Sequence, residues 1–244
     1  MPDLPEVPGL ADQPKHGMGR WVTLDCYGTM VDWNAGLGGA LSGLWPSSSV
    51  ARLLNAYHEQ EPLVEKADPS ATYRTVLRRT LEAVAQTQGL ELRAGDRNAL
   101  AESLPDWPVF EDVCPALGAV REQGWRLAVL SNVDPDLLAG SLARVGVPVD
   151  DTVTAREAGA YKPARNHWQE FLCRRSQKLA AHVHVGASTF HDIAPAAELG
   201  IPAVWVNRLG ESSDLPRIAE LASLTGLGRV LVPFEDECDT ATAS

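Results

Sequence analysis

Short apolar runs recur along the chain, and each gives way to polar residues after a few positions. The runs cover residues 20–24, 126–131, 182–187 and 203–207, and their lengths are typical of β-strands. The stretches between them carry apolar residues at helical spacing and end at glycines suited to helix C-caps. Strands that alternate with helices predict an α/β fold, with a parallel sheet covered by helices on both faces.

Residues 34–105 break this alternation, because they contain helical patterns and no convincing strand. The second helical stretch has Ser70 as a candidate N-cap and Gly89 as a candidate stop. We therefore expect a helical cap domain at 34–105, inserted after the first strand of an α/β core formed by 20–33 and 106–228.

The two ends of the chain differ from this core in composition. Residues 1–19 are rich in proline, glycine and charge, which predicts a flexible leader. Residues 229–244 begin with the apolar run RVLVPF and end in acidic and small polar residues. This pattern predicts a C-terminal strand followed by an acidic tail.

Composition narrows the class of protein. The formal net charge of −11 argues against a nucleic-acid binder, although a local basic site could still hold a small anionic substrate. The four cysteines lack the CxxC spacing of zinc sites, and no apolar run is long enough to cross a bilayer. With no secretory signal at the N-terminus, we expect a cytoplasmic protein with reduced thiols and no membrane contact.

Polar residues that could bind a substrate or take part in catalysis follow several of the predicted strands. Because the carboxyl ends of parallel strands meet at one edge of the sheet, these side chains are expected to converge there. The candidate residues are Asp25, Tyr27, Thr29, Ser131, Asn132, Lys162, Ser188 and Asp192.

This set fits the chemistry of a carboxylate nucleophile. Asp25 must be ionised to attack, and the Lys162 ammonium would favour that form. Thr29, Ser131 and Asn132 can donate hydrogen bonds to an anionic substrate, and Asp192 can orient Lys162 or position a water molecule. Each residue alone also has a structural explanation, since aspartates often form turns or begin helices. Their common placement at strand ends is harder to explain by structure alone.

These residues stand in motifs that resemble those of the haloacid dehalogenase superfamily. The motifs are DCYGT (25–29), SN (131–132), YKP (161–163) and GASTFHD (186–192), and the first resembles the L-2-haloacid dehalogenase (type II) branch. The resemblance implies a Rossmann-like core with a helical cap. It also implies that Asp25 is the nucleophile, that Lys162 and Asp192 form a charge network, and that no metal or cofactor is required. Substrate-binding roles are implied for Tyr27, Thr29, Ser131, Asn132 and Ser188.

Tyr27 separates two reactions that this fold can host. Phosphatases of the superfamily usually have a second aspartate at that position, which protonates the leaving alcohol. A tyrosine, with an ordinary pKa near 10, is a poor proton donor at neutral pH, whereas a halide leaves without a proton. The resemblance therefore implies displacement of halide from C2 of a short 2-haloacid, followed by hydrolysis of the aspartyl ester to a 2-hydroxy acid.

Alternatives stay open at this point. A Mg²⁺-dependent phosphatase acting on a small phosphorylated metabolite would need an acid where Ala187 stands in the fourth motif. A non-enzymatic binding protein would not need Asp25, Lys162 and Asp192 together, and an oxidoreductase would need a GxGxxG loop that the first strand lacks. Well-studied dehalogenases receive the halide on a cap arginine, which has no clear counterpart among Arg52, Arg74, Arg78 and Arg79. A homodimer, common in that branch, is a further possibility.

Overall fold

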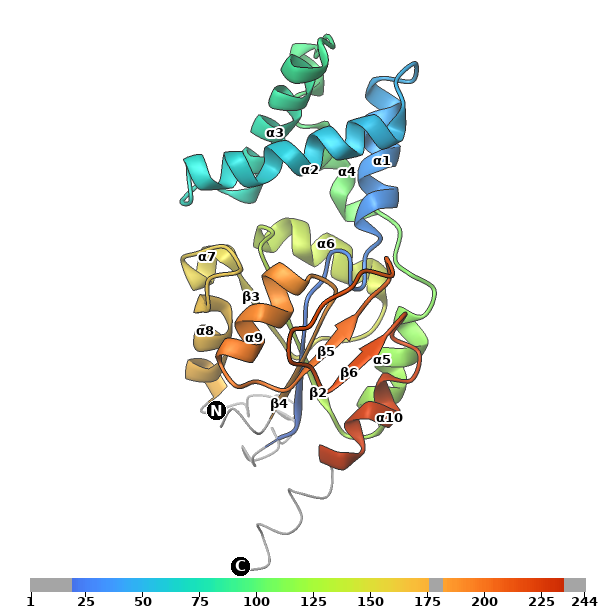
Figure 1. Ribbon diagram of the computed structural model, residues 1–244, viewed down its shortest axis with the longest axis vertical. Coiled ribbons are helices and arrows are strands. Elements are labelled where there is room, and N and C mark those ends of the chain that lie inside the picture. Colours follow the sequence, from blue (N-terminus) through green and yellow to red (C-terminus); the bar gives the residue numbers. More distant parts are fainter. Residues whose placement is uncertain (1–18, 176–181, 235–244) are drawn as a thin grey trace, which may run out of the picture.

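The computed structural model describes residues 19–175 and 182–234, which form a six-stranded parallel sheet with helices on both faces (Figure 1). The strand order is β3-β2-β1-β4-β5-β6, so β1 lies inside the sheet between β2 and β4. The strands are β1 (Trp21–Leu24), β2 (Arg126–Ser131), β3 (Asp151–Thr154), β4 (His182–Gly186), β5 (Ala203–Val206) and β6 (Ala219–Leu221).

Both faces of the sheet are buried, as the α/β pattern predicted. Alternate residues of β2 point to opposite sides: Leu127 and Val129 belong to one apolar cluster, Ala128 and Leu130 to the other. The first cluster includes residues of α5 (Val113–Glu122), α6 (Pro135–Val145) and α10 (Leu227–Leu231). The second includes residues of α8 (Asn166–Arg175) and α9 (Ala194–Glu198), and the short α7 (Ala155–Ala158) follows β3.

Helices α1 to α4 form a separate layer beyond the carboxyl ends of the strands (Figure 1). They are α1 (Trp33–Leu44), α2 (Val50–Ala67), α3 (Tyr73–Gln88) and α4 (Ala99–Ser103). This confirms the expected helical cap inserted after the first strand, while the exact limits 34–105 stay a prediction.

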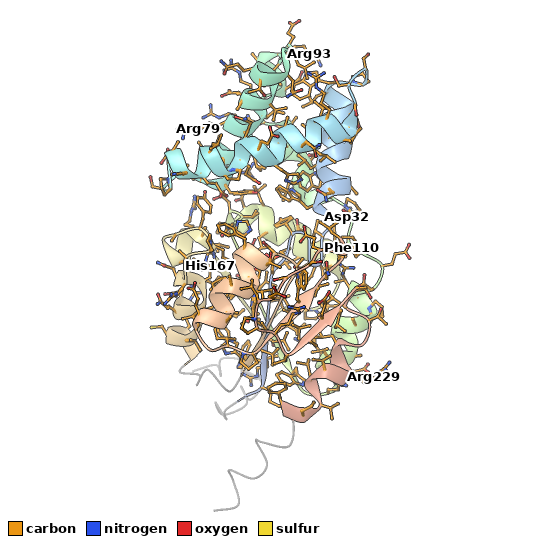
Figure 2. All side chains as sticks on the ribbon, in the orientation of Figure 1. Asp32, Arg79, Arg93, Phe110, His167 and Arg229 are labelled. Carbon is orange, nitrogen blue, oxygen red and sulfur yellow. The ribbon has the colours of Figure 1, made fainter. Side chains whose placement is uncertain are left out.

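Two chain segments, residues 30–32 and 108–110, pass between the core and the cap and lie side by side. The Asp32 amide donates to the Pro108 carbonyl (2.7 Å), and the Phe110 amide donates to the Met30 carbonyl (3.0 Å). Asp32 and Phe110 lie at this crossing in Figure 2. The crossing fixes where the cap leaves the core, directly after the loop that carries Asp25.

Several local expectations need correction. Residues 229–231, expected in a C-terminal strand, belong to helix α10, because Leu227 and Leu231 lie one helical turn apart and are both buried near α5. Helix α3 begins after Thr72, whose hydroxyl accepts the Thr75 amide hydrogen, and not after Ser70. Gly89 does end it, in a left-handed conformation (φ +65°).

Other expectations concern residues that the structure does not describe or elements that the pattern did not reveal. The leader, apart from residue 19, and the acidic tail from residue 235 lie outside the described residues. The short edge strands β3 and β6 were not predicted. Within the described ranges, no helix has the length and apolar character needed to span a membrane.

Candidate active site

Asp25 lies directly after β1, at the start of a tight loop. Its amide donates to the Val185 carbonyl of β4 (2.9 Å), which continues the sheet pairing by one residue. The loop then closes on itself through hydrogen bonds from the Met30 amide to the Cys26 carbonyl (2.7 Å) and from the Gly28 amide to the Val31 carbonyl (2.8 Å). Gly28 has a φ of +89°, which a residue with a Cβ atom rarely adopts, so glycine suits this turn. The loop holds Asp25 at the carboxyl edge of the sheet.

Asp25, Lys162 and Asp192 form one buried ionic group. The Lys162 Nζ lies 2.7 Å from Asp25 Oδ1 and 2.8 Å from Asp192 Oδ1. The side chains of Lys162 and Asp192 are 2% and 0% exposed, whereas that of Asp25 is 11% exposed. Asp25 is therefore the member of the group that retains access from outside.

The ionisation of this group follows from its geometry. Burial alone would lower the pKa of Lys162, but the charges of Asp192 and Asp25 outweigh it and hold that pKa well above its usual range. Burial would likewise raise the pKa of Asp192, but the Lys162 charge and the adjacent His184 hold it well below its usual range. For Asp25, burial and the Asp192 charge raise the pKa, against the opposing effect of Lys162 and Thr29.

Thr29 connects the Asp25 loop to the segment after β4. Its hydroxyl donates to Asp25 Oδ2 (2.8 Å) and accepts the Ala187 amide hydrogen (2.9 Å). Both oxygens of the Asp25 carboxylate thus receive a hydrogen bond, one from Lys162 and one from Thr29. The side chain is held in one orientation, which is what a nucleophile at a fixed site needs.

Lys162 is held by Asn132. The Asn132 Oδ1 accepts the Lys162 amide hydrogen (2.6 Å), and its Nδ2 donates to the Lys162 carbonyl (3.2 Å). The sequence predicted that Lys162 directly follows a strand. In the structure β3 ends at Thr154 and α7 intervenes. The two hydrogen bonds to Asn132 hold the Lys162 main chain beside the end of β2. Both ends of the Asn132 amide are used in this way.

Ser131 and Ser188 lie at the carboxyl ends of β2 and β4. Ser131 Oγ accepts the Val133 amide hydrogen (3.3 Å), so its own hydrogen can be donated to a ligand. The Ser188 amide donates to Asp192 Oδ2 (3.2 Å), and its Oγ accepts the His191 amide hydrogen (3.0 Å). Ser188 therefore begins the helical turn that presents Asp192.

The Tyr27 hydroxyl is bound to the core. It lies 2.8 Å from Ser141 Oγ on α6, and burial raises the pKa of Tyr27 far above the ordinary value. The phenol instead joins the Asp25 loop to α6. The structure therefore brings together Asp25, Thr29, Lys162, Asn132 and Asp192, and it places Tyr27 beside them as a loop contact.

Comparison with known proteins identifies the family of this chain. A family model described as haloacid dehalogenase-like hydrolase matches residues 20–200, which is most of the chain. The chain belongs to this family. The resemblance of the four motifs is thus confirmed at the level of the family.

Individual relatives cover nearly the same length. The (S)-2-haloacid dehalogenase 1 of Pseudomonas sp. (strain CBS-3) is 27% identical over 233 residues, covering 87% of this chain and 96% of the relative. The (S)-2-haloacid dehalogenase 4A of Burkholderia cepacia is 24% identical, covering 80% and 86%. The solved structure of L-2-haloacid dehalogenase from Xanthobacter autotrophicus with chloropropionic acid covalently bound has a TM-score of 0.76 at 19% identity, covering 88% and 98%. This last match shows that the fold is shared.

Sequence reasoning missed two residues near the site of this haloacid dehalogenase-like hydrolase, His184 and Arg208. His184 on β4 lies between Thr23 and Asp192, with Nδ1 3.0 Å from Thr23 Oγ1 and Nε2 3.5 Å from Asp192 Oδ1. Arg208 donates to the Thr29 carbonyl (2.8 Å) and to Asp112 (2.9 and 3.0 Å). A histidine inside the apolar strand β4 is a polar residue at a buried position, and this could have marked His184 from the sequence. No motif marks Arg208.

The residues that could bind a metal ion are few near Asp25. Among the described residues, no group of three or more His, Cys, Asp or Glu side chains is arranged to hold a metal. The space between Asp25 and Asp192 is taken by the Lys162 ammonium, and Ala187 offers no side-chain oxygen. The positive charge between the carboxylates of Asp25 and Asp192 is therefore supplied by the Lys162 side chain.

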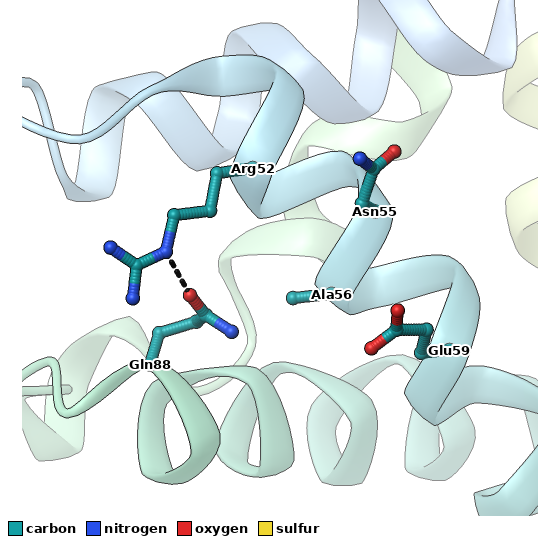
Figure 3. Close-up of a pocket in the computed structure, with 5 residues that line it drawn as sticks. All are labelled: Arg52, Asn55, Ala56, Glu59 and Gln88. Atoms are coloured by element: carbon teal, nitrogen blue, oxygen red, sulfur yellow. Dashed lines mark hydrogen bonds between the residues drawn. The ribbon is translucent and has the colours of Figure 1, made fainter.

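The cap carries a groove of about 440 Å³ between α2 and α3, lined by Arg52, Asn55, Ala56, Glu59 and Gln88 (Figure 3). Arg52 Nε donates to Gln88 Oε1 across it. Gln88 ends α3, close in sequence to Arg93, which lies at the end of the cap farthest from the core (Figure 2). Arg52 therefore faces this outer groove and not Asp25.

Gly186 gives Asp192 its position, and this can be tested. A Cβ atom on Gly186 would lie 2.5 Å from Asp192 Cβ and Cγ, so Gly186→Ala must displace the carboxylate. We expect about 1–3 kcal/mol of destabilisation in urea unfolding and about tenfold or more loss of activity.

Gly118→Ala in α5 is the matched control, because nothing lies within 4 Å of its added methyl group. That variant should be as stable as the parent or up to about 1 kcal/mol more stable. A Gly186→Ala protein with unchanged stability and activity would show that Asp192 does not need its present position.

Proposed function

We propose that this protein is a metal-independent hydrolase that removes halide from a short 2-haloacid and releases the 2-hydroxy acid. The observation that carries the proposal is the buried Asp25–Lys162–Asp192 group, in which a lysine ammonium holds a partly accessible carboxylate. The dehalogenase relatives named above support the same substrate class, since they cover most of the chain.

In the first step, an oxygen of the Asp25 carboxylate attacks C2 of the substrate. The C2–halogen bond breaks, its electron pair leaves with the halide, and an ester with Asp25 forms. Lys162 and Thr29 hold the carboxylate in the attacking orientation through their bonds to its two oxygens. The covalently bound chloropropionic acid in the Xanthobacter enzyme supports an ester of this kind.

The substrate carboxylate needs hydrogen-bond donors near Asp25. Ser131 supplies a hydroxyl at the end of β2, next to β1 in the sheet. Asn132, expected to share this role, has its side chain bound to the Lys162 main chain, so we assign its amide to positioning the lysine. Ser188 is assigned to holding the turn that carries Asp192.

In the second step, water attacks the carbonyl carbon of the Asp25 ester. The bond between that carbon and the former Asp25 oxygen on C2 breaks, which frees the 2-hydroxy acid and restores the carboxylate with an oxygen from water. Of the two water protons, one ends on the product hydroxyl and the other is released to solvent. The Lys162 ammonium, held by Asp192, lies where negative charge develops on the ester oxygen. No proton is needed for halide departure, which agrees with the Tyr27 hydroxyl being occupied by Ser141.

The direct test is a panel of 2-haloacids and phosphate esters, each assayed with EDTA and with Mg²⁺. We expect halide release that EDTA does not reduce, and no phosphate release above background. Phosphate release that requires Mg²⁺ would instead establish the phosphatase alternative. Absence of both activities over a wide panel would favour a binding role for the fold.

A further inference from the structure

Arg208 lies two residues after β5 and binds two other segments of the chain with its guanidinium group. Its Nε and Nη2 both donate to the Thr29 carbonyl, at 3.1 and 2.8 Å. Its Nη1 and Nη2 donate to the two carboxylate oxygens of Asp112, at 3.0 and 2.9 Å. The Arg208 side chain is 10% exposed, and its Cζ lies 3.8 Å from the centre of the Phe110 ring. A guanidinium suits this place because it is planar, donates in several directions and stacks on a ring.

Asp112 anchors this guanidinium group. It follows Phe110, which lies where the chain returns from the cap to the core (Figure 2). Asp112 Oδ2 also accepts the Leu224 amide hydrogen (2.6 Å). Burial alone would raise the pKa of Asp112, but hydrogen bonds from Arg208 and the Leu224 amide hold that pKa below its usual value. Asp112 is therefore ionised at neutral pH and fixed in place.

The carbonyl that Arg208 binds belongs to the residue whose hydroxyl orients Asp25. The Thr29 hydroxyl donates to Asp25 Oδ2 (2.8 Å) and accepts the Ala187 amide hydrogen (2.9 Å), and Thr29 is fully buried. Among the residues that the structure describes, only Arg208 donates to the Thr29 carbonyl. The bonds within the loop therefore leave this carbonyl to Arg208.

We infer that Arg208 is a positioning residue, which holds the Thr29 main chain against Asp112 so that the Thr29 hydroxyl fixes Asp25 for its attack on C2. The inference rests on the proposed function, because this attack is the step that the orientation serves. Arg208 takes up no proton and no electron pair in the reaction. It acts through the carbonyl and the hydroxyl of Thr29, and it joins the loop of the nucleophile to the segment that returns from the cap.

The ionisation of Asp25 provides a measure of this role. The titratable or charged groups that face Asp25 are Lys162 after α7, Asp192 after β4, and Cys26 and Tyr27 on its own loop. Burial and the Asp192 charge raise the pKa of Asp25, whereas Lys162 and the Thr29 hydrogen bond lower it. Loss of the Thr29 bond should therefore raise the pKa of Asp25 further, and the acid limb of the rate profile should move to higher pH. A residue that only supports the fold would not move this limb.

The main test is the double variant that combines Arg208→Met with Asp112→Asn. Arg208→Met alone would leave the Asp112 carboxylate without its cation, and loss of one partner of a partly buried ion pair destabilises the fold by itself. The double variant removes one positive and one negative charge, so the net charge beside the loop is unchanged. The asparagine oxygen can still accept the Leu224 amide hydrogen. Neither an unpaired charge nor a change of net charge can then explain an effect on Asp25.

A matched pair for the control lies at the other end of the sheet. Arg121 donates to the Pro148 carbonyl (3.0 Å) and to Asp150 (2.6 Å), and Asp150 accepts the Leu127 amide hydrogen (2.9 Å). Leu127 is near the start of β2, whereas Asp25 follows the carboxyl end of the parallel strand β1. Arg121→Met combined with Asp150→Asn therefore removes the same kind of ion pair away from the site.

The first experiment measures halide release from 2-chloropropionate against pH, with urea unfolding as a check of the fold. The Arg208 double variant should keep KM within about threefold and lose about 30-fold in kcat, because substrate still binds but the carboxylate is misdirected. Its acid limb should lie at higher pH than that of the parent. The Arg121 double variant should match the parent in kcat and in the acid limb. An acid limb that stays in place in the folded Arg208 double variant would overturn the inference, whether kcat is kept or lost.

Arg208→Lys keeps the inference testable if the double variant does not fold. Lysine retains the positive charge beside Asp112, but its single nitrogen cannot bind both the carbonyl and the carboxylate as the guanidinium does. This variant should show the same changes in kcat and in the acid limb, to a smaller extent. Values equal to those of the parent would mean that Thr29 does not need to be held against Asp112, which would also overturn the inference.

The second experiment does not depend on turnover. The carboxyl carbon of Asp25 is titrated by NMR in protein labelled with ¹³C in its aspartates, and its signal is assigned by its absence in Asp25→Asn. The signal should titrate at higher pH in the Arg208 double variant than in the parent, and at the pH of the parent in the Arg121 double variant. If no 2-haloacid is hydrolysed but this difference is found, the proposed function fails while the hold of Arg208 on Asp25 stands. If Asp25 titrates as in the parent, the role of Arg208 is wrong whether or not the protein is a dehalogenase.

Discussion

Asp25→Asn is expected to reduce halide release from 2-haloacids by at least about 10⁴-fold while the protein stays folded. The amide has the shape of the carboxylate, and its oxygen can still accept a hydrogen bond from Lys162 or Thr29. It lacks the negative charge that attacks carbon, so the first step of the reaction is lost. The measurement is kcat/KM for 2-chloropropionate, with circular dichroism and urea unfolding as checks of the fold.

Asp32→Asn is the matched control for this variant. Asp32 begins α1, where its side chain accepts the Ala35 amide hydrogen (3.0 Å), and asparagine serves equally well at such a position. Its activity should stay within about twofold of the parent. The mass of the purified Asp25→Asn protein should also be measured, because hydrolysis of the asparagine would restore the parent. Full activity in an intact Asp25→Asn protein would exclude Asp25 as the nucleophile.

Lys162→Met is expected to lower both activity and stability. Methionine is close to lysine in length but carries no charge, so Asp25 and Asp192 would face each other without their shared cation. Removing one partner from a buried ionic group typically costs about 3–5 kcal/mol, and we expect that loss in urea unfolding at neutral pH. Activity should fall by about 10³-fold or more, because neither Asp25 nor the charge on the ester oxygen is stabilised.

The pH dependence of the remaining activity provides a second measurement. The Lys162 charge lowers the pKa of Asp25, against burial and the Asp192 charge, which raise it. Without the lysine, the pKa of Asp25 rises further, so residual activity should move to higher pH. A residual activity that peaks at the same pH as the parent would separate Lys162 from the ionisation of Asp25.

Arg165→Met is the control for the stability measurement. Arg165 pairs with Glu198 on the surface, where the two side chains are 50% and 57% exposed. Exposed ion pairs contribute roughly 0–1 kcal/mol, so this variant should be nearly as stable as the parent. Equal losses in Arg165→Met and Lys162→Met would show that the buried position of Lys162 has no special importance.

The positions of Asp25 and Ser131 were predictable from the sequence, because each directly follows or ends an apolar run long enough for a buried strand. The parallel sheet then brings these ends to one edge. The expectation that Lys162 directly follows a strand was wrong, because α7 separates it from β3, so only its motif marked it. The roles of Thr29 and Asn132 as holders of Asp25 and Lys162 needed the hydrogen bonds of the folded chain.

Other features could not be read from local pattern. The RVLVPF run is apolar enough for a strand. It nevertheless begins inside helix α10, whose buried residues Leu227 and Leu231 form the face that packs against α5. Arg208 reaches the Thr29 carbonyl across a sequence distance that no motif marks. Within the cap, the hydroxyls of Tyr57 on α2 and Tyr73 on α3 both donate to Glu61, and these bonds depend on how α2 and α3 cross, which hydrophobic spacing does not specify.

The origin of the product oxygen tests the account most directly. A single turnover in ¹⁸O-water, with enzyme in excess over 2-chloropropionate, should place the label in the Asp25 carboxylate and give an unlabelled hydroxyl in the first product. Mass spectrometry of the peptide that contains residues 21–31 and of the released 2-hydroxy acid would measure both. Label in the product hydroxyl during the first turnover, with Asp25 unlabelled, would mean that water attacks C2 itself and would contradict the covalent role of Asp25.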